Sequence, residues 1–282
     1  MIYTIKNDEL TVQIKKKGAE LCSVKNKQGF EFIWQAESVW PRHAPNLFPI
    51  IGSLIDHQYV YEGKTYDLRH HGFARDTDFD LLHQSEHSAC FVLQNNNENF
   101  KLYPFNFTLL IIYTLEGNSL QQRFRVINDD TKTIPMSFGG HPAFNVESVA
   151  DYEIKFNKLE SGQPNLLEGP YISEVEENVL EGDTITLTTS IFDKDALVFQ
   201  QLNSTEVTLQ HKKTNHAVRV EFAEFPFLGI WAKPGANFVC IEPWQGLADL
   251  VNHNKEIKEK KGMLWLEKEQ EVTKTFAMTF TL

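Results

Sequence analysis

Short runs of alternating or β-branched apolar residues recur along the whole chain and are separated by turn residues. The clearest pair covers 107–115 and 120–127 around the turn-forming Gly117 and Asn118, which predicts a β-hairpin. Aromatic residues make up 12% of the chain, with 21 Phe, and such side chains suit pleated, half-buried strands. Many short strands with few helices predict an all-β protein, built as a large antiparallel β-sandwich.

The remaining strands and the domain organisation follow from the same pattern. Further strands are expected at 11–14, 30–34, 152–156, 184–187, 196–199, 206–212, 217–222, 238–241 and 275–282. The charged segment 254–261 lacks an apolar face, so we expect a solvated loop or a single turn there. No linker or repeat divides the 282 residues, and we expect one domain over 1–282.

Charge and cysteine usage restrict the classes of partner. The chain has 27 basic and 38 acidic residues, a formal charge of −11, which argues against binding of nucleic acid or anionic membrane. Cys22, Cys90 and Cys240 form no disulfide or zinc spacing, and we expect them in the core. Without a signal-like start or a bilayer-length apolar run, the sequence predicts a soluble, cytoplasmic protein.

Three short segments combine proton-transferring side chains with glycine or proline: 70–76, 139–145 and 240–249. In the second segment, Gly139 and Gly140 permit a close backbone approach, and Pro142 restricts the chain after His141. An imidazole held in this way suits acid–base chemistry near neutral pH. The same residues are equally consistent with a turn histidine bonded to backbone carbonyls.

Glu242 follows the apolar run 238–241, and we expect Pro243 to end that strand. A carboxylate at the end of a buried strand is partly desolvated, which raises its basicity. Trp244 adds a flat apolar face of the kind that stacks on sugar C–H groups. The alternative is a glutamate that caps a loop or pairs with a lysine.

His71 and Arg75 lie four residues apart in a turn-prone segment and offer one neutral and one charged donor. A solvated surface loop explains them equally well, and spacing does not separate His71 from its neighbour His70. The chain contains no phosphate-binding loop, dinucleotide fingerprint, nucleophile elbow or zinc-binding helix motif, so no nucleotide cofactor is predicted.

Taken in order, these segments resemble the aldose 1-epimerase (galactose mutarotase) family. Within it, the similarity is to a divergent, LacX-like bacterial branch associated with lactose and galactose utilisation. Five motifs over most of the chain carry the resemblance: 45–52, 71–75, 141–145, 195–199 and 242–246.

The resemblance implies a large β-sandwich with a long open cleft, a small sugar as partner, and no cofactor or metal. It implies that Glu242 takes the proton of the anomeric hydroxyl while His141 protonates the ring oxygen, which opens the hemiacetal. Reclosure after a bond rotation yields the other anomer. His71, Arg75 and Asp195 are expected to bind the hydroxyls or ring oxygen of the sugar.

One position departs from the family pattern. An arginine is usual after the motif that ends at Gly52, whereas this chain has Ser53. Either Arg42 or Arg75 replaces that guanidinium, or the substrate differs from galactose. Together with His43, these arginines leave a hexose phosphate open beside a neutral hexose.

Two other functions fit the same residues. One is a non-catalytic sugar-binding protein that keeps the cleft without turnover. The other is a metal site in which His71, His141 and Glu242 supply two imidazoles and a carboxylate. The chain is expected to be a monomer or a weak homodimer.

Overall fold

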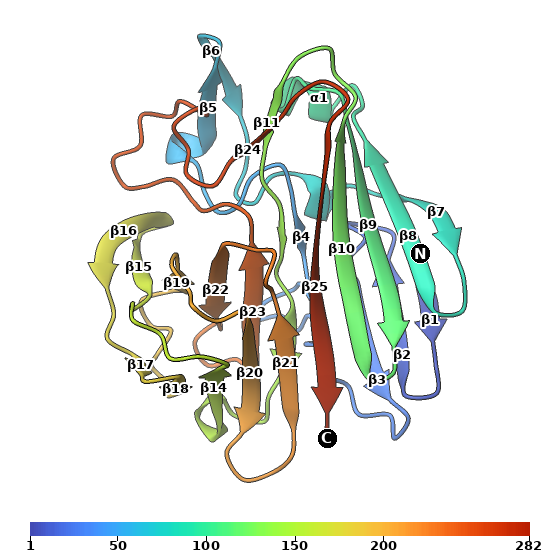
Figure 1. The fold of residues 1–282 in the computed structure, drawn as a ribbon, viewed down its shortest axis with the longest axis vertical. Coiled ribbons are helices and arrows are strands. Elements are labelled where there is room, and N and C mark those ends of the chain that lie inside the picture. Colours follow the sequence, from blue (N-terminus) through green and yellow to red (C-terminus); the bar gives the residue numbers. More distant parts are fainter.

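Antiparallel strands form two large sheets in the computed structural model, which describes residues 1–282 (Figure 1). One sheet has ten strands in the order β17 (Leu180–Glu181), β18 (Thr184–Thr186), β14 (Tyr152–Phe156), β20 (Glu206–His211), β21 (Ala217–Glu221), β25 (Glu271–Thr281), β10 (Ser119–Asn128), β9 (Phe107–Glu116), β8 (Ser88–Gln94) and β7 (Asp80–Gln84). The other follows the order β16 (Tyr171–Glu176), β15 (Asn165–Glu168), β19 (Leu197–Phe199), β22 (Phe227–Trp231), β23 (Phe238–Trp244), β12 (Gly139–Gly140) and β4 (Asn46–Leu47), and β13 (Ala143–Asn145) also pairs with β23.

Smaller sheets and short helices complete the chain. The small sheets are β1 (Ile2–Lys6), β2 (Leu10–Lys15) and β3 (Leu21–Asn26); β5 (Gln58–Tyr61) and β6 (Lys64–Asp67); and β11 (Ile134–Met136) and β24 (Leu264–Leu266). The helices are α1 (Asn99–Leu102), η1 (Ile55–His57), η2 (Ala74–Asp76) and η3 (Val149–Asp151). None of them has the length and apolar character that a membrane crossing requires. The all-β, antiparallel prediction is confirmed.

The two large sheets pack against each other through aromatic side chains. Phe156 of β14 contacts Phe199 of β19 with ring centroids 5.3 Å apart, and Phe144 of β13 lies 6.5 Å from Phe280 of β25. The main core cluster contains 63 buried residues drawn from the whole chain, beginning with Ile5. The number of domains stays a prediction.

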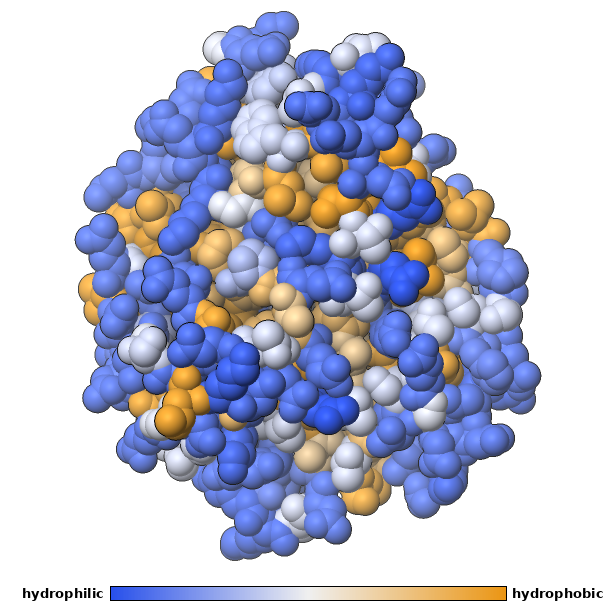
Figure 2. All heavy atoms as spheres, in the orientation of Figure 1, coloured by the Kyte–Doolittle hydropathy of each residue, from blue (hydrophilic) through white to orange (hydrophobic).

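The surface is mostly hydrophilic, so most apolar side chains of the strands lie in the interior. In the view of Figure 2, hydrophilic residues cover most of the face and hydrophobic residues appear in separate patches. Large exposed apolar side chains such as Leu82 and Leu159 are scattered along the chain. The aromatic content therefore serves the core and the pocket described below.

The predicted hairpin is confirmed as β9 and β10, the most extensively paired strands of the ten-stranded sheet. Their register places Glu116 opposite Ser119, so the turn consists of Gly117 and Asn118. Gly117 has φ +56°, a conformation that glycine adopts without steric cost. Buried residues alternate along β10, as its sequence pattern predicts.

The other predicted strands are present with one exception, and β23 and β25 are longer than expected. The exception is 30–34, where only isolated bridges form at Glu31 and Ile33. Side chains replace a regular ladder there. The Glu31 carboxylate accepts the N–H groups of Val24 and Ile33, and Asn145 donates to the carbonyls of residues 31 and 33.

Two local predictions are wrong. Pro243 does not end its strand, because β23 continues to Trp244; Pro243 lies opposite the break between β12 and β13, where a missing N–H costs no ladder bond. The segment 254–261 forms turns as expected, but it is not fully solvated. Ile257 and Lys260 are buried, and Lys260 pairs with the buried Asp249 at 2.9 Å.

Candidate active site

One pocket, about 250 Å³ in volume, brings together residues from distant parts of the chain. Its lining includes all seven residues that the sequence analysis selected: Arg42, His71, Arg75, His141, Asp195, Glu242 and Trp244. The strands β22 and β23, the segment before β19 and the region of β15 and β16 all contribute lining residues. The pocket is smaller than the roughly 300–1,000 Å³ of sites for drug-sized ligands, so it suits a single small ring.

Glycine lets the chain that carries His141 pass close to its neighbours. His141 lies between β12 and β13, which both pair with β23, the strand of Glu242. A Cβ on Gly139 would lie 2.5 Å from the carbonyl oxygen of residue 243, and one on Gly140 would lie 2.6 Å from the ring of Phe276. Only glycine fits at either position, as the sequence predicted for this segment.

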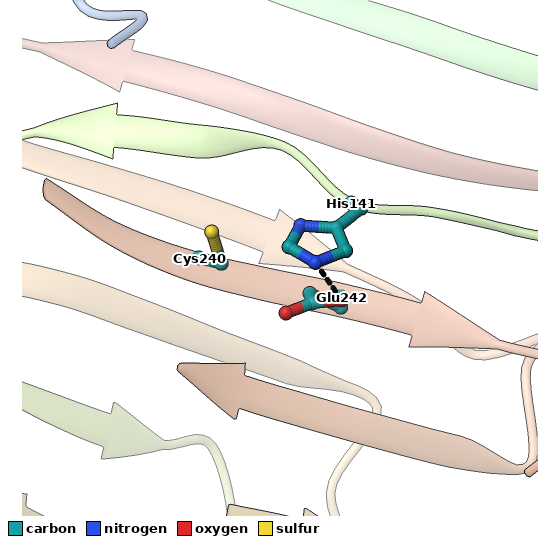
Figure 3. Close-up of side chains that lie close together, drawn as sticks. All are labelled: His141, Cys240 and Glu242. Carbon is teal, nitrogen blue, oxygen red and sulfur yellow. Dashed lines mark ion pairs between the residues drawn. The ribbon is translucent and has the colours of Figure 1, made fainter. Parts of the chain in front are cut away.

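His141 and Glu242 meet directly in the pocket (Figure 3). The Nε2 atom of His141 lies 3.1 Å from Oε2 of Glu242. The glutamate is 1% exposed and the histidine 8%. No well-aligned hydrogen bond reaches Glu242 Oε2 or His141 Nδ1. Since buried polar atoms are nearly always satisfied in native structures, these two atoms mark a place where a ligand is expected to bind.

Burial controls where the proton of this pair resides. It raises the pKa of Glu242 well above its ordinary value, and the negative charge of Asp195 adds to the shift. Burial also lowers the pKa of His141 to about 3, helped by the positive charge of Arg75. Both shifts favour the uncharged forms of the pair, a protonated carboxyl group and a neutral imidazole. A transfer across the 3.1 Å contact converts them into a carboxylate and an imidazolium.

His71 is held in one orientation by the backbone. Its Nδ1 accepts the N–H of Gly52 at 2.9 Å, so the neutral ring carries its proton on Nε2 and can donate it. Burial lowers the pKa of His71 well below its usual value. The residue has φ +62°, and the following Gly72 at φ +72° would collide with Phe48 if it carried a Cβ. The turn thus presents a neutral donor to the pocket.

Ser53, which stands where the family pattern has an arginine, contacts His70. The hydroxyl of Ser53 lies 2.8 Å from Nδ1 of His70, and Ser53 itself does not line the pocket. Both His70 and His71 line it, so the structure brings both candidate rings to the site. Burial lowers the pKa of His70 to about 4, with a smaller effect of Arg75.

Arg42 and Arg75 are the two arginines of the pocket lining, and both lie near the carboxylate of Asp76. Asp76 lies 3.1 Å from Arg42 and 3.8 Å from Nε of Arg75. Arg75 also donates to the carbonyl of His70 at 2.7 Å, while its buried Nε has no hydrogen-bond partner. Burial and the charge of Arg42 lower the pKa of Arg75 to about 10. Asp76 neutralises part of the charge that a phosphate group would need.

Asp195 stands at the exposed rim, in the turn before β19, with φ +79°. Its Oδ1 accepts the N–H of Ala196 at 2.8 Å, which fixes the side chain against the turn. Trp244 follows Glu242 on β23 and points to the same face of the sheet. Both residues line the pocket.

Two tryptophans that the sequence analysis did not select complete the aromatic wall. The ring of Trp40 stacks on His141 with centroids 5.2 Å apart, and Trp231 meets the same imidazole edge-on at 6.0 Å. Trp40 precedes Pro41 and Arg42 in a proline-rich segment, which was the available signal. Trp231 ends an ordinary apolar strand and has no local signal at all.

The residues able to hold a metal differ from the set expected from the sequence, which was His71, His141 and Glu242. The ligand atoms of His141, Cys240 and Glu242 lie within 4.8 Å of one another, and all three residues are buried. Cys240 and Glu242 are two positions apart on β23 and therefore share one face. His71 does not belong to this group, and its Nδ1 is engaged by the backbone of Gly52.

Comparisons with known proteins identify the family of the chain. The family model described as aldose 1-epimerase matches residues 1–264. The chain is 35% identical to protein LacX of Lactococcus lactis subsp. lactis over 92% of its own length and 93% of that protein. A galactose mutarotase related enzyme from Lactobacillus acidophilus superposes with a TM-score of 0.95 at 36% identity, covering 99% of this chain and 97% of that one.

A second solved structure, of a galactose mutarotase-like protein from Lactobacillus casei, has a TM-score of 0.95 at 32% identity, over 99% of this chain and 100% of that one. The galactose mutarotase-like fold and the similarity to LacX expected from the motifs are confirmed. Such epimerases are isomerases that bind sugars. The chain belongs to the aldose 1-epimerase family.

Proposed function

We propose that this chain is an aldose 1-epimerase that interconverts the α and β anomers of a hexose. The observation that carries the proposal is the buried contact of 3.1 Å between His141 and Glu242 in the wall of a pocket of sugar-ring size. Mutarotation needs one base and one acid around a single small ring, and a positioned acid or base contributes a factor of about 10²–10⁴. The pair supplies both.

In the proposed reaction, the carboxylate of Glu242 removes the proton of the anomeric O1 hydroxyl while the imidazolium of His141 protonates the ring oxygen. The C1–O5 bond breaks, O1 becomes the aldehyde oxygen, and the sugar is open. After rotation about the C1–C2 bond, the two groups act in reverse and close the ring on the other face. No proton or electron is gained or lost over the cycle.

The remaining polar groups of the pocket are proposed to hold the sugar. The Nε2–H of His71 and the guanidinium of Arg75 donate to sugar oxygens, and the Asp195 carboxylate accepts from hydroxyls at the rim. The indole faces of Trp40 and Trp244 contact the apolar C–H side of the ring. Fixing the ring between these groups places its reacting oxygens at the acid and the base.

A free hexose fits the charges better than a hexose phosphate. Arg42 and Arg75 are the positive groups of the pocket, and Asp76 contacts both of them. Asp195 adds a further negative charge to the lining. Hence we propose galactose or glucose as the first substrates to test, with their 6-phosphates as the comparison.

Exchange spectroscopy by NMR on equilibrated galactose and glucose tests the proposal. The enzyme should accelerate α–β interconversion in proportion to its concentration, above the rate of the buffer. Saturable sugar binding by calorimetry without any acceleration would replace the proposal with the non-catalytic sugar-binding protein. Absence of both would remove every sugar-directed function.

We also propose that the chain works as one domain over 1–282, since the pocket takes residues from Trp40 to Ala248 and the core cluster from Ile5 to Phe280. The three cysteines are unpaired, which is consistent with a reducing cytoplasm. Limited proteolysis would contradict the first point if it released a stably folded fragment.

A further inference from the structure

The proposed reaction leaves one side chain beside the acid–base pair unused. Cys240 is fully buried on β23, in an apolar cluster that contains Trp34, Ala143 and Phe238. Its sulfur lies within 4.8 Å of the nearest ligand atoms of both His141 and Glu242. Figure 3 shows the three side chains close together over β23.

We propose that His141, Cys240 and Glu242 form a binding site for a soft divalent metal ion, Zn²⁺, and that the bound ion inhibits the enzyme. The metal site is argued from geometry and ligand chemistry alone. Only the inhibition rests on the proposed function.

The spacing of the three side chains is close to that of a tetrahedral zinc site. Zinc binds sulfur at about 2.3 Å and imidazole nitrogen or carboxylate oxygen at about 2.0–2.2 Å, which places ligand atoms about 3.3–3.6 Å apart. Nε2 of His141 and Oε2 of Glu242 are 3.1 Å apart, and the sulfur lies within 4.8 Å of one ligand atom of each residue. A side-chain adjustment on the order of 1 Å completes the triangle.

Glu242 provides an independent indication of a missing ligand. Its Oε2 atom is buried without a well-aligned hydrogen bond and lies 3.1 Å from Nε2 of His141. A buried carboxylate oxygen without a partner is costly, and a metal ion is one way to satisfy it. Three protein ligands leave the fourth position free for a water molecule on the pocket side.

Charge balance favours a divalent cation, and the types of ligand atom favour zinc. A thiolate, a carboxylate and a neutral imidazole carry two negative charges, which Zn²⁺ cancels in a site where uncompensated charge is costly. Both the thiol proton and the proton of the His141–Glu242 pair leave to solvent as the metal–ligand bonds form, and no electron is transferred. Sulfur and nitrogen ligands select zinc over Mg²⁺ and Ca²⁺, which prefer oxygen.

Occupation of the site would stop the proposed reaction. The metal ion would use the Nε2 lone pair of His141 and the carboxylate of Glu242, so neither could transfer a proton. His141 and Glu242 both line the pocket, which gives the ion a route to the thiol behind them.

The experiment uses the full chain and its three unpaired cysteines. Zinc is titrated against a chromophoric chelator for the wild type, Cys240→Ala and the matched control Cys90→Ala, and thermal unfolding verifies that each variant is folded. We expect one zinc per wild-type chain and a zinc affinity at least about 100-fold weaker in Cys240→Ala. Loss of a residue that only supports a metal ligand costs about 10–100-fold in affinity, and loss of a ligand itself should cost at least as much. Cys90→Ala should bind like the wild type.

Cobalt substitution in the wild type tests thiolate ligation without any mutation, through a thiolate-to-cobalt charge-transfer band in the near ultraviolet. Anomer exchange is then measured with and without zinc, each variant relative to its own zinc-free rate, and inhibition should be lost in Cys240→Ala. Equal zinc affinity in Cys240→Ala, or no zinc binding by the wild type, overturns the site. Should the chain lack epimerase activity, the chelator titration and the cobalt band still decide whether the site exists.

Discussion

Two buried pairs that each contain a carboxyl group, Asp249–Lys260 and His141–Glu242, differ in how completely their polar atoms are hydrogen-bonded. In the first, Asp249 accepts the Lys260 ammonium at 2.9 Å and the N–H of Ile55 at 2.9 Å, and Lys260 also donates to the carbonyl of Leu247. In the second, His141 and Glu242 touch at 3.1 Å while one atom of each residue has no aligned hydrogen bond. Every polar side-chain atom of the first pair is satisfied, and the second pair is left incomplete at a pocket.

The difference separates a group that holds the structure from a group that can react. The Asp249 segment is tied to the chain beside Ser53, whose carbonyl accepts the Asp249 N–H, and it keeps Ala248 in the wall of the pocket. A reactive pair cannot be satisfied in this way, because its free hydrogen-bonding capacity must be available to the substrate. We therefore expect the two pairs to respond in opposite ways to mutation.

The largest effect is expected on turnover. Replacing Glu242 with Gln or His141 with Asn should slow anomer exchange by about 10²–10⁴-fold, because each change removes one proton-transfer group. Neither change should lower the midpoint of thermal unfolding, since the pair does little to stabilise the fold. NMR exchange and thermal denaturation are the measurements. Unchanged rates in both variants would remove the pair from the mechanism.

The structural pair should show the reverse pattern. Lys260→Met leaves Asp249 buried without its cation, and we expect a loss of about 3–5 kcal/mol in the free energy of unfolding, measured with urea. The matched control Lys261→Met changes the exposed neighbour and should cost less than about 0.5 kcal/mol. A cost as small as that of the control would mean that the pair does not anchor this segment.

Lowering the pH should decrease the free energy of unfolding because of His70, which lines the pocket. Its pKa is lowered to about 4 in the folded protein, whereas an unfolded histidine titrates near 6.5. At pH 7 neither state is protonated there, but between pH 6.5 and 4 the unfolded chain binds a proton that the folded chain does not. His70 alone should lower the free energy of unfolding by up to about 3 kcal/mol over that range. The loss should be smaller in His70→Gln, in urea titrations at pH 7 and 4.5; equal losses would contradict the assignment.

The smallest effect is expected on the KM for a phosphorylated sugar, from the partly exposed charge of Asp76. Asp76→Asn removes the carboxylate shared by Arg42 and Arg75, and KM for a hexose 6-phosphate should fall by about threefold. Kinetics with the free hexose are the control and should be unchanged. If the wild type already turned over the phosphate much faster than the free hexose, the proposed substrate preference would be reversed.

Much of the fold could be predicted because strand formation leaves a local mark. Alternation over 120–127 and the turn residues Gly117 and Asn118 act within a few positions of one another, so the hairpin is readable from the sequence. The failure at 30–34 has a non-local cause. Asn145 and the Glu31 carboxylate take the hydrogen bonds that a ladder would have made, and no alternation pattern contains that information.

Some residues of the site also carry a local sequence signal, and others do not. His141 and Glu242 were selected because glycines, a proline and an apolar run mark them locally, and the family resemblance added Asp195. Trp231 was missed because a tryptophan at the end of an apolar strand looks like any core residue. Of the three cysteines expected in the core, Cys22 and Cys240 are buried and Cys90 is only partly buried. The position of Cys240 beside the pair was not predictable.

By itself, the sequence determined the all-β class, most strands and the residue types of the pocket, because period-2 alternation, turn chemistry and short motifs are local properties. Only the tertiary structure decided which residues meet. The pairing of β12 and β13 with β23 joins His141 to Glu242 and Cys240, and the packing of the loop after β23 buries Lys260 against Asp249. Burial then favours the uncharged forms of His141 and Glu242, and burial is a property of the whole fold.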